Sequence, residues 1–146
     1  MLSDSCGPYD LLDDLDLRGP SAAHQAQVYS FTLAVCERVT NSLPDVALQG
    51  LSVSRAFHAG TADLNALVQA RVACWNFLGS RSGDLQDPGV CRVRLAICTM
   101  FAEPDDPFTV LHTVLDFATR AGVNDSDLSA LLAAHFQVLP RREQQP

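Results

Sequence analysis

The chain carries four histidines and five cysteines, the residue types that most often serve as metal ligands or nucleophiles. Zinc ligands on one helix stand three or four residues apart, and no histidine has a second His, Cys or Glu at that spacing. No two cysteines form a Cys-x-x-Cys pair, the signature of a zinc ribbon or a thioredoxin-like site. The sequence therefore predicts no metal site and no cofactor.

Two arrangements that contain a histidine remain as candidates for catalysis. Asp116 stands four residues after His112, so a helix would place both side chains on one face. Cys74 and His58 would meet if their helices pack side by side, and a Cys–His pair is the core of a thiol hydrolase. Cys74 lies beside Trp75 in an apolar stretch, however, and apolar surroundings make a thiol inert. We therefore expect no catalytic residues, with an unrecognised Cys/His enzyme as the weakest alternative.

Acidic residues form the most distinctive polar pattern of the chain, in two clusters within residues 1–20 and 103–106. Neither cluster has the regular spacing of a calcium-binding loop. Oppositely charged patches speed association and suppress wrong partners, so we expect these clusters to contact a basic protein. Tyr9 and Leu11, which stand next to the acids, are the expected apolar anchors. The predicted partner-binding residues are Tyr9, Asp10, Leu11, Asp13, Asp14, Asp16, Glu103, Asp105 and Asp106.

The overall charge and the choice of basic residues narrow the classes of function. Seventeen acidic residues stand against ten basic ones, which gives a net charge of −7. A nucleic-acid-binding surface needs a basic face, so we expect no nucleic acid as partner. All ten basic residues are arginine, which excludes Schiff-base catalysis by lysine and the phosphate-binding lysine of a Walker loop.

The sequence gives no sign of a membrane or secreted protein. No apolar run approaches the ~18 residues of a membrane-spanning helix. The first residues lack the basic and then apolar stretches of a secretory signal, so we expect a cytoplasmic protein. Four of the five cysteines stand among Ala, Val, Leu and Ile, which indicates free thiols that pack as small hydrophobic groups.

Apolar spacing and helix-breaking residues divide the chain into helices. Residues 1–20 form an acidic N-terminal arm whose leucines would lie on the domain while its acids stay in water. The helical domain spans 21–139 and a flexible tail spans 140–146, with helices expected near 21–42, 44–60, 61–78, 88–102, 107–121 and 124–139. No strand-like alternation persists. The sequence predicts an all-α fold, a single-domain antiparallel helical bundle of about six helices with short loops.

For two of these helices, the sequence also predicts which parts are buried. The helix near 88–102 is almost continuously apolar, so it should lie at the centre of the domain or at the twofold interface of a homodimer. A homo-oligomeric adaptor or structural protein is therefore a second class of function. In the helix near 61–78, one buried stripe is expected to contain Leu64, Leu67, Val68, Val72, Trp75 and Leu78.

A sequence pattern also runs through residues 60–120. It consists of Ala-Arg-Val-Ala-Cys-Trp at 70–75, the segment 84–88, Arg-Leu-Ala-Ile-Cys at 94–98 and the turn Phe-Ala-Glu-Pro at 101–104. The pattern resembles small helical immunity-type proteins of bacterial polymorphic toxin systems. The resemblance implies a single helical domain that neutralises a cognate toxin by binding it, and it transfers no catalytic residue. We therefore expect a non-enzymatic protein-binding module whose partner is a cognate basic toxin or another basic protein.

Overall fold

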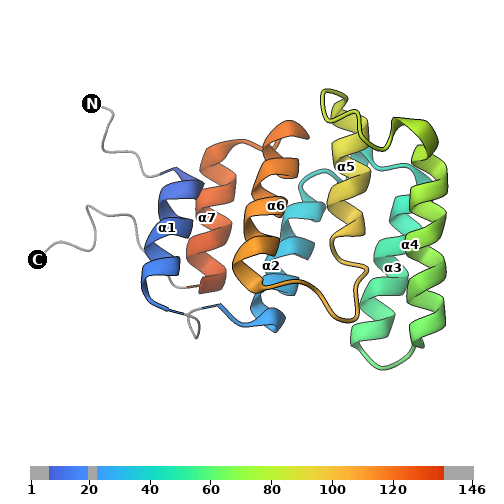
Figure 1. Cartoon of the computed structure of the whole chain (residues 1–146), viewed down its shortest axis with the longest axis horizontal. Coiled ribbons are helices and arrows are strands. Elements are labelled where there is room, and N and C mark those ends of the chain that lie inside the picture. Colours follow the sequence, from blue (N-terminus) through green and yellow to red (C-terminus); the bar gives the residue numbers. More distant parts are fainter. Residues whose placement is uncertain (1–6, 20–22, 137–146) are drawn as a thin grey trace, which may run out of the picture.

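A computed structural model describes residues 7–19 and 23–136 of the chain (Figure 1). This part contains no strand, which confirms the predicted all-α bundle. Single 3₁₀ turns occur at Thr40–Ser42 and Gly79–Arg81. The α-helices are α1 (Pro8–Leu17), α2 (Gln25–Glu37), α3 (Asp45–His58), α4 (Leu64–Leu78), α5 (Pro88–Ile97), α6 (Pro107–Arg120) and α7 (Asp125–Phe136).

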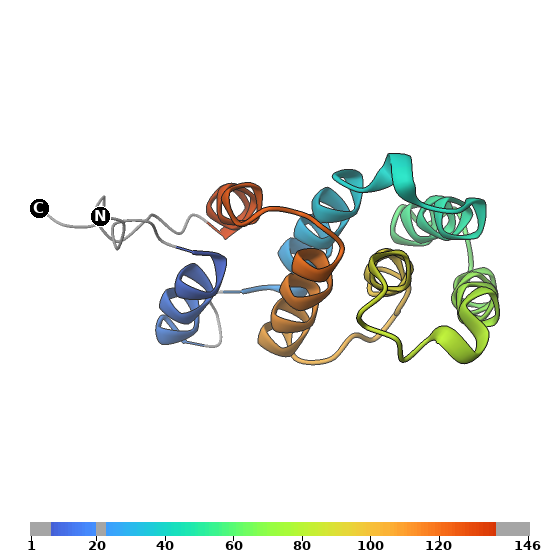
Figure 2. The ribbon, with the colours of Figure 1, turned by 90° about the horizontal axis from the view of Figure 1, so that it is seen from above.

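The helices stack in two layers, as the two views of the ribbon show (Figures 1 and 2). The first layer contains α1, α6, α5 and α4 in that order, and the second contains α7, α2 and α3. Contacts of α1 with α7, α6 with α2 and α4 with α3 join the layers. Because α5 contacts α2, α3, α4 and α6, it occupies the central position that its apolar sequence predicted.

The structure makes α1 a helix of the bundle. Leu11, Leu12 and Leu15 are at most 1% exposed and pack where α1 contacts α6 and α7. Pro8 suits the first turn, because its fixed backbone angle is helical and its missing N–H would have no partner there. The leucines thus lie on the domain, as expected of the N-terminal arm. The tail, residues 140–146, lies outside the described part of the chain.

Acidic side chains start three of the helices in the first layer. Asp63, Asp87 and Asp106 precede α4, α5 and α6, and each carboxylate accepts backbone N–H bonds of 2.8–3.3 Å from the first turn. Such caps pair N–H groups that have no partner within the helix and place negative charge at its positive end. These three acids therefore have a structural role.

The predicted buried stripe of α4 is wrong in part. Leu67 and Leu78 are buried in the core, but Leu64 is 54% exposed and Val72 is 43% exposed, while Trp75 is half-buried. α4 ends the first layer, and its main neighbours are α3 and α5, which cover one side of it. Apolar residues occur on more sides of α4 than these neighbours can cover, so the spacing alone selected too wide a stripe.

A chain of hydrogen bonds fixes the end of α5. The hydroxyl of Ser54 donates to the carbonyl oxygen of Thr99 at 2.7 Å, and it lies 2.8 Å from the hydroxyl of Tyr29. Because serine has one hydroxyl proton, Tyr29 must donate to Ser54. The ring of Tyr29 also stacks on His58, with 3.7 Å between centroids. These contacts hold the point at which the connection from α5 to α6 begins.

Candidate functional site

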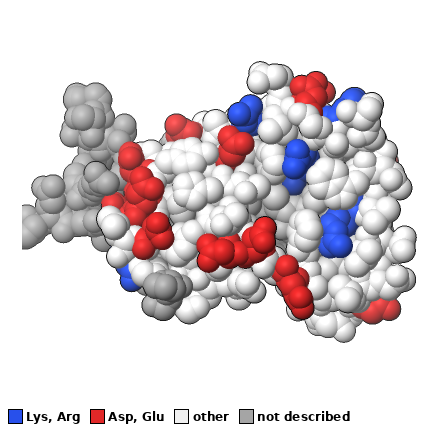
Figure 3. All heavy atoms as spheres, in the orientation of Figure 1, with Lys and Arg blue, Asp and Glu red and all other residues white. Residues whose placement is uncertain are grey.

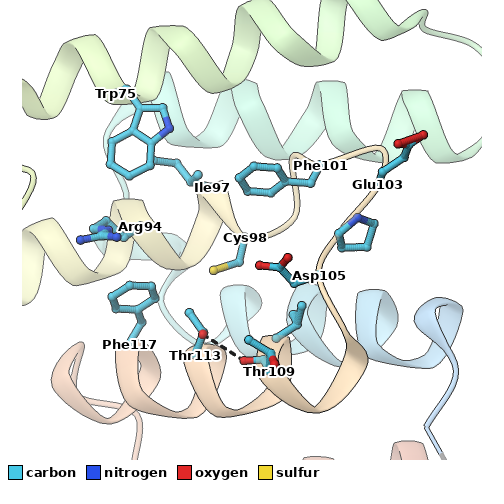
Figure 4. A pocket seen from close by; sticks show the side chains of 12 residues that line it. Trp75, Arg94, Ile97, Cys98, Phe101, Glu103, Asp105, Thr109, Thr113 and Phe117 are labelled. Carbon is cyan, nitrogen blue, oxygen red and sulfur yellow. Dashed lines mark hydrogen bonds between the residues drawn. The ribbon is translucent and has the colours of Figure 1, made fainter. Parts of the chain in front are cut away.

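A groove of about 430 Å³ opens on the first layer, between α4 and α6 (Figure 4). Trp75 on α4 and Phe117 on α6 stand on its two sides, and Ile97 and Cys98 at the end of α5 line its floor. The connection between α5 and α6, residues 98–106, closes one end. The groove exists because α5, the central helix, lies deeper than its neighbours in the first layer (Figure 2).

Arg94 lies at the other end of the groove, between two aromatic rings (Figure 4). Its guanidinium carbon is 5.2 Å from the ring centroid of Trp75 and 4.8 Å from that of Phe117. Its Nη1 donates a hydrogen bond of 3.1 Å to the carbonyl oxygen of Ser82. Aromatic faces attract a cation, so these contacts hold the guanidinium in place. Among the residues that the structure describes, no carboxylate forms an ion pair with Arg94.

Glu103 and Asp105 line the part of the groove that lies away from Arg94, where the carboxylate of Asp105 faces Phe101 and that of Glu103 points outward (Figure 4). Both are exposed, and Pro104 and Pro107 restrict the backbone that carries them. The groove therefore has a positive end, a negative end and an apolar middle.

Phe101 forms much of the apolar middle, and α4 holds it in place. The guanidinium carbon of Arg71 lies 4.6 Å from the centroid of the Phe101 ring. The Nη1 atom of Arg71 also donates a hydrogen bond of 2.6 Å to the carbonyl oxygen of Met100. One arginine thus fixes both the backbone and the aromatic ring at the start of the connection.

The cysteines of the described chain have thiols that stay protonated at neutral pH. Burial raises the pKa of Cys98, on the groove floor, to about 12, although the charge of Arg94 acts in the opposite direction. Burial raises the pKa of Cys74 to about 11, and it also raises the pKa values of Cys36 and Cys91. A protonated thiol is a poor nucleophile, so these groups are suited to packing.

The structure does not bring Cys74 and His58 together. In an antiparallel pair of helices, residues equally far from the turn lie opposite each other, which places Cys74 opposite the start of α3. Accordingly, the thiol of Cys74 lies against Gly50 and donates to the carbonyl oxygen of Val46 at 3.6 Å. His58 ends α3 and has its Nδ1 atom 3.0 Å from the carbonyl oxygen of Ser54.

The second candidate pair, His112 and Asp116, has separate partners. Asp116 forms an ion pair of 3.2 Å with Arg120. The ring of His112 lies beside that of Tyr9, with 6.0 Å between centroids. Within residues 7–19 and 23–136, no group of three or more His, Cys, Asp or Glu side chains is placed to hold a metal ion. In the same ranges, no helix is long and apolar enough to cross a membrane.

The predicted contact residues of α1 divide into exposed and buried ones. Tyr9 is 40% exposed, and burial of the rest of its ring raises its pKa, with Asp116 and Asp125 acting in the same direction. Leu11 is a correction, because it faces the core together with Leu12 and cannot anchor a partner. Asp14 is partly buried. The remaining predicted residues of α1 are exposed, namely Asp10, Asp13 and Asp16.

The two acidic clusters lie on one face of the molecule. Figure 3 shows acidic side chains over α1 and over the connection between α5 and α6, and arginines toward α4 and α5. We call the exposed acids of the two clusters, apart from the capping residue Asp106, the acidic face: Asp10, Asp13, Asp16, Glu103 and Asp105. The groove opens beside its second cluster.

Sequence reasoning did not find Arg94, Phe101 and Phe117 as site residues, and it assigned Trp75 to the core. One available signal was Arg94 itself, since a charged residue inside an apolar helix needs a partner or a route to water. No protein-family model, curated protein or solved structure matches the chain. The geometry alone therefore defines the site as an apolar groove with opposite charges at its ends.

Proposed function

We propose that this chain is a non-enzymatic protein-binding module that binds a basic protein through its acidic face. The observation that carries the proposal is that two acidic clusters, far apart in sequence, gather on one face beside an apolar groove. The form that we favour is an immunity protein that neutralises a cognate basic toxin, because of the resemblance of residues 60–120 to that class.

The acidic face and the groove would supply different parts of the binding. Exposed ion pairs contribute only ~0.2–1 kcal/mol each, because water and salt screen them. The acids would therefore act chiefly on the rate of association, as complementary charges do. Tight binding also needs apolar or aromatic groups at the centre of the interface. Phe101, which is exposed beside the acids, meets that need, as does Tyr9 on α1.

The environment of the cysteines and histidines supports binding over catalysis. The cysteine on the groove floor, Cys98, has a pKa raised to about 12, far from the pH at which a thiolate would be useful. Cys74 and His58 are directed to different backbone carbonyls of α3. Neither candidate pair thus has the mutual contact on which nucleophile activation depends.

The experiment compares two variants of equal net charge. The site variant carries Asp13→Asn, Asp16→Asn and Asp105→Asn on the acidic face. The control variant carries Glu37→Gln, Asp45→Asn and Asp127→Asn on helices of the second layer. The wild-type chain, immobilised, captures its partner from a lysate of the source cells, and stopped-flow mixing then gives association rates at low and high salt.

We expect the captured partner to be a basic protein. The site variant should associate about tenfold more slowly at low salt and depend less on salt, because charges near the interface steer the encounter. The control variant should behave like the wild type. Equal rates for the two variants, or capture of a neutral or acidic partner, would contradict the proposal.

A specific observation favours the homo-oligomeric adaptor as a second candidate. On α4, Leu64 and Val72 are each more than 40% exposed and stand about two turns apart on adjoining sides of the helix, so a second copy of the chain would remove both from water. Light scattering at micromolar concentration tests this candidate directly. A dimer that dissociates on Val72→Asp substitution supports it, and a monomeric wild type removes it.

A further inference from the structure

We infer that the groove binds a segment of the partner that contains a bulky apolar side chain. This segment carries Lys or Arg on one side of the apolar residue and no basic residue on the other side. The inference rests on the proposed function and names the part of the basic partner that the groove would receive. Its basis is the placement of the charges along the groove, with Arg94 at one end and Asp105 well away from it, where its carboxylate faces the ring of Phe101 across the groove (Figure 4).

The middle of the groove suits an apolar side chain. Trp75, Ile97 and Phe101 line it, and the volume of about 430 Å³ falls in the range of about 300–1,000 Å³ that is typical of binding pockets. An apolar group placed there displaces water from two aromatic faces. A segment without such a group would leave this surface hydrated and would lose most of the stabilisation.

The charged ends decide which side of the apolar residue can carry a base. Glu103 and Asp105 are exposed acids, so a Lys or Arg side chain at their end forms ion pairs. Arg94 occupies the opposite end, where it repels a second base. Its guanidinium donates one described hydrogen bond, to Ser82, and its other N–H groups suit the backbone carbonyl oxygens of a bound segment.

The groove is held in shape before any partner arrives. The rings of Trp75 and Phe117 and the carbonyl of Ser82 fix Arg94. Arg71 fixes the ring of Phe101 through its guanidinium. Binding to a site that is already arranged costs less conformational entropy than binding to one that must be ordered. The order of the charges along the groove can therefore select among segments.

Trp75 makes the inference directly measurable, because it is the single tryptophan of the chain and it lines the groove. Tryptophan emission is followed while the purified full chain is titrated with synthetic peptides that contain no tryptophan. The first peptide, Ac-Gly-Phe-Leu-Gly-Arg-Arg-Gly-amide, has bases on one side. In the second, glutamines replace the arginines. The third, Ac-Arg-Arg-Gly-Phe-Leu-Gly-Arg-Arg-Gly-amide, has bases on both sides.

We expect a saturable change in emission with the first peptide and about tenfold weaker binding of the second, since two partly screened ion pairs are lost. The third peptide should bind no better than the first, although it carries twice the charge, because Arg94 repels its extra bases. If charge alone decides, so that the third peptide binds tightest, the inference is overturned. The inference is also overturned if the first peptide does not change the tryptophan emission of the chain.

Variants of the chain test the two ends of the groove separately. The double variant Glu103→Gln with Asp105→Asn should bind the first peptide about tenfold more weakly. The control double variant, Glu37→Gln with Asp45→Asn, should bind it with unchanged affinity. Arg94→Gln should let the third peptide bind more tightly than the first. Unchanged affinity in the first double variant contradicts the inference even if the Arg94 variant fails to fold.

The peptide titration and the partner experiment can fail independently. If the site variant slows association with a basic partner while no peptide changes the emission of Trp75, the proposed function stands and the groove inference falls. If the peptides bind in the predicted order but the captured partner is acidic, the specificity of the groove stands and the proposed function falls.

Discussion

α1 and α4 lie at the two ends of the first layer, and they use their apolar residues differently. The short helix α1 buries three leucines, Leu11, Leu12 and Leu15, against α6 and α7. The longer helix α4 leaves Leu64 and Val72 in contact with water. Each helix has two main helix neighbours, so the comparison teaches that the position of apolar residues around a helix, as much as their number, decides which become buried.

The largest effect that separates the two helices is expected from truncating a leucine of α1. Leu15 has no exposed surface, so Leu15→Ala should lower the free energy of unfolding by about 2–5 kcal/mol. Val72→Ala on α4 should change it by less than about 0.5 kcal/mol, as for other surface positions. Urea denaturation of both variants measures the difference, and equal losses would mean that α1 is not part of the cooperative unit.

Cys74, on the inner side of α4, should make the free energy of unfolding depend on pH. Burial raises the pKa of Cys74 from 9.0 to about 11, so near pH 10 the folded chain keeps a proton that the unfolded chain has lost. Stability from this group is complete below pH 9 and is lost as pH rises toward 11. Under reducing conditions, Cys74→Ala should therefore flatten the decline of unfolding free energy across this window. An unchanged slope would contradict the buried position.

Replacing the acid that caps each helix should lower the free energy of unfolding by a smaller amount, and the loss should differ between α4 and α1. Asp63 accepts the N–H of Ala66 at 2.8 Å at the start of α4, so Asp63→Ala should cost about 1 kcal/mol. At the start of α1, Asp10 accepts the N–H of Gly7 at the longer distance of 3.2 Å. Asp10→Ala should therefore cost less than Asp63→Ala in thermal or urea unfolding. The reverse order would indicate that α1 depends on its cap more than on its leucines.

The smallest effect is expected on the outer side of α4. Leu64→Ser should change the free energy of unfolding by less than about 0.5 kcal/mol, because the side chain is already 54% exposed. A loss of about 2 kcal/mol or more, measured at micromolar concentration, would show that something covers this position in solution. A second copy of the chain is then the first candidate, and repeating the measurement at several concentrations tests it.

The sequence predicted the elements of the fold better than the site. Breakers such as Pro88 and Pro107 marked the helices, and the spacing of leucines marked the inner side of α1. The end of α5 was predicted too late, because the expected helix ran through Thr99 and Met100 into the connection. Beyond Ile97, the backbone N–H groups of Thr99 and Met100 donate to carbonyl oxygens three residues back, at Ala96 and Ile97, which is the bonding of a tight turn.

The groove could not be predicted because three separate segments build it. Trp75, Arg94 and Phe117 belong to three helices, and their rings and guanidinium meet only when α5 lies deeper than α4 and α6. Periodicity assigns each residue to a side of its own helix, but it does not give the relative depth of neighbouring helices. The acids of the connection were predicted because exposed charges and prolines are local features.

The contact of α1 with α6 and α7 also sets an order of events during synthesis. A ribosome makes α1 before α2 to α5, and it makes α6 and α7, which cover the leucines of α1, only after them. Until then, Leu11, Leu12 and Leu15 of the nascent chain have none of their final neighbours from those helices. The acids interleaved with them, Asp13 and Asp16, would keep this stretch hydrated and make it a poor site for aggregation while it waits.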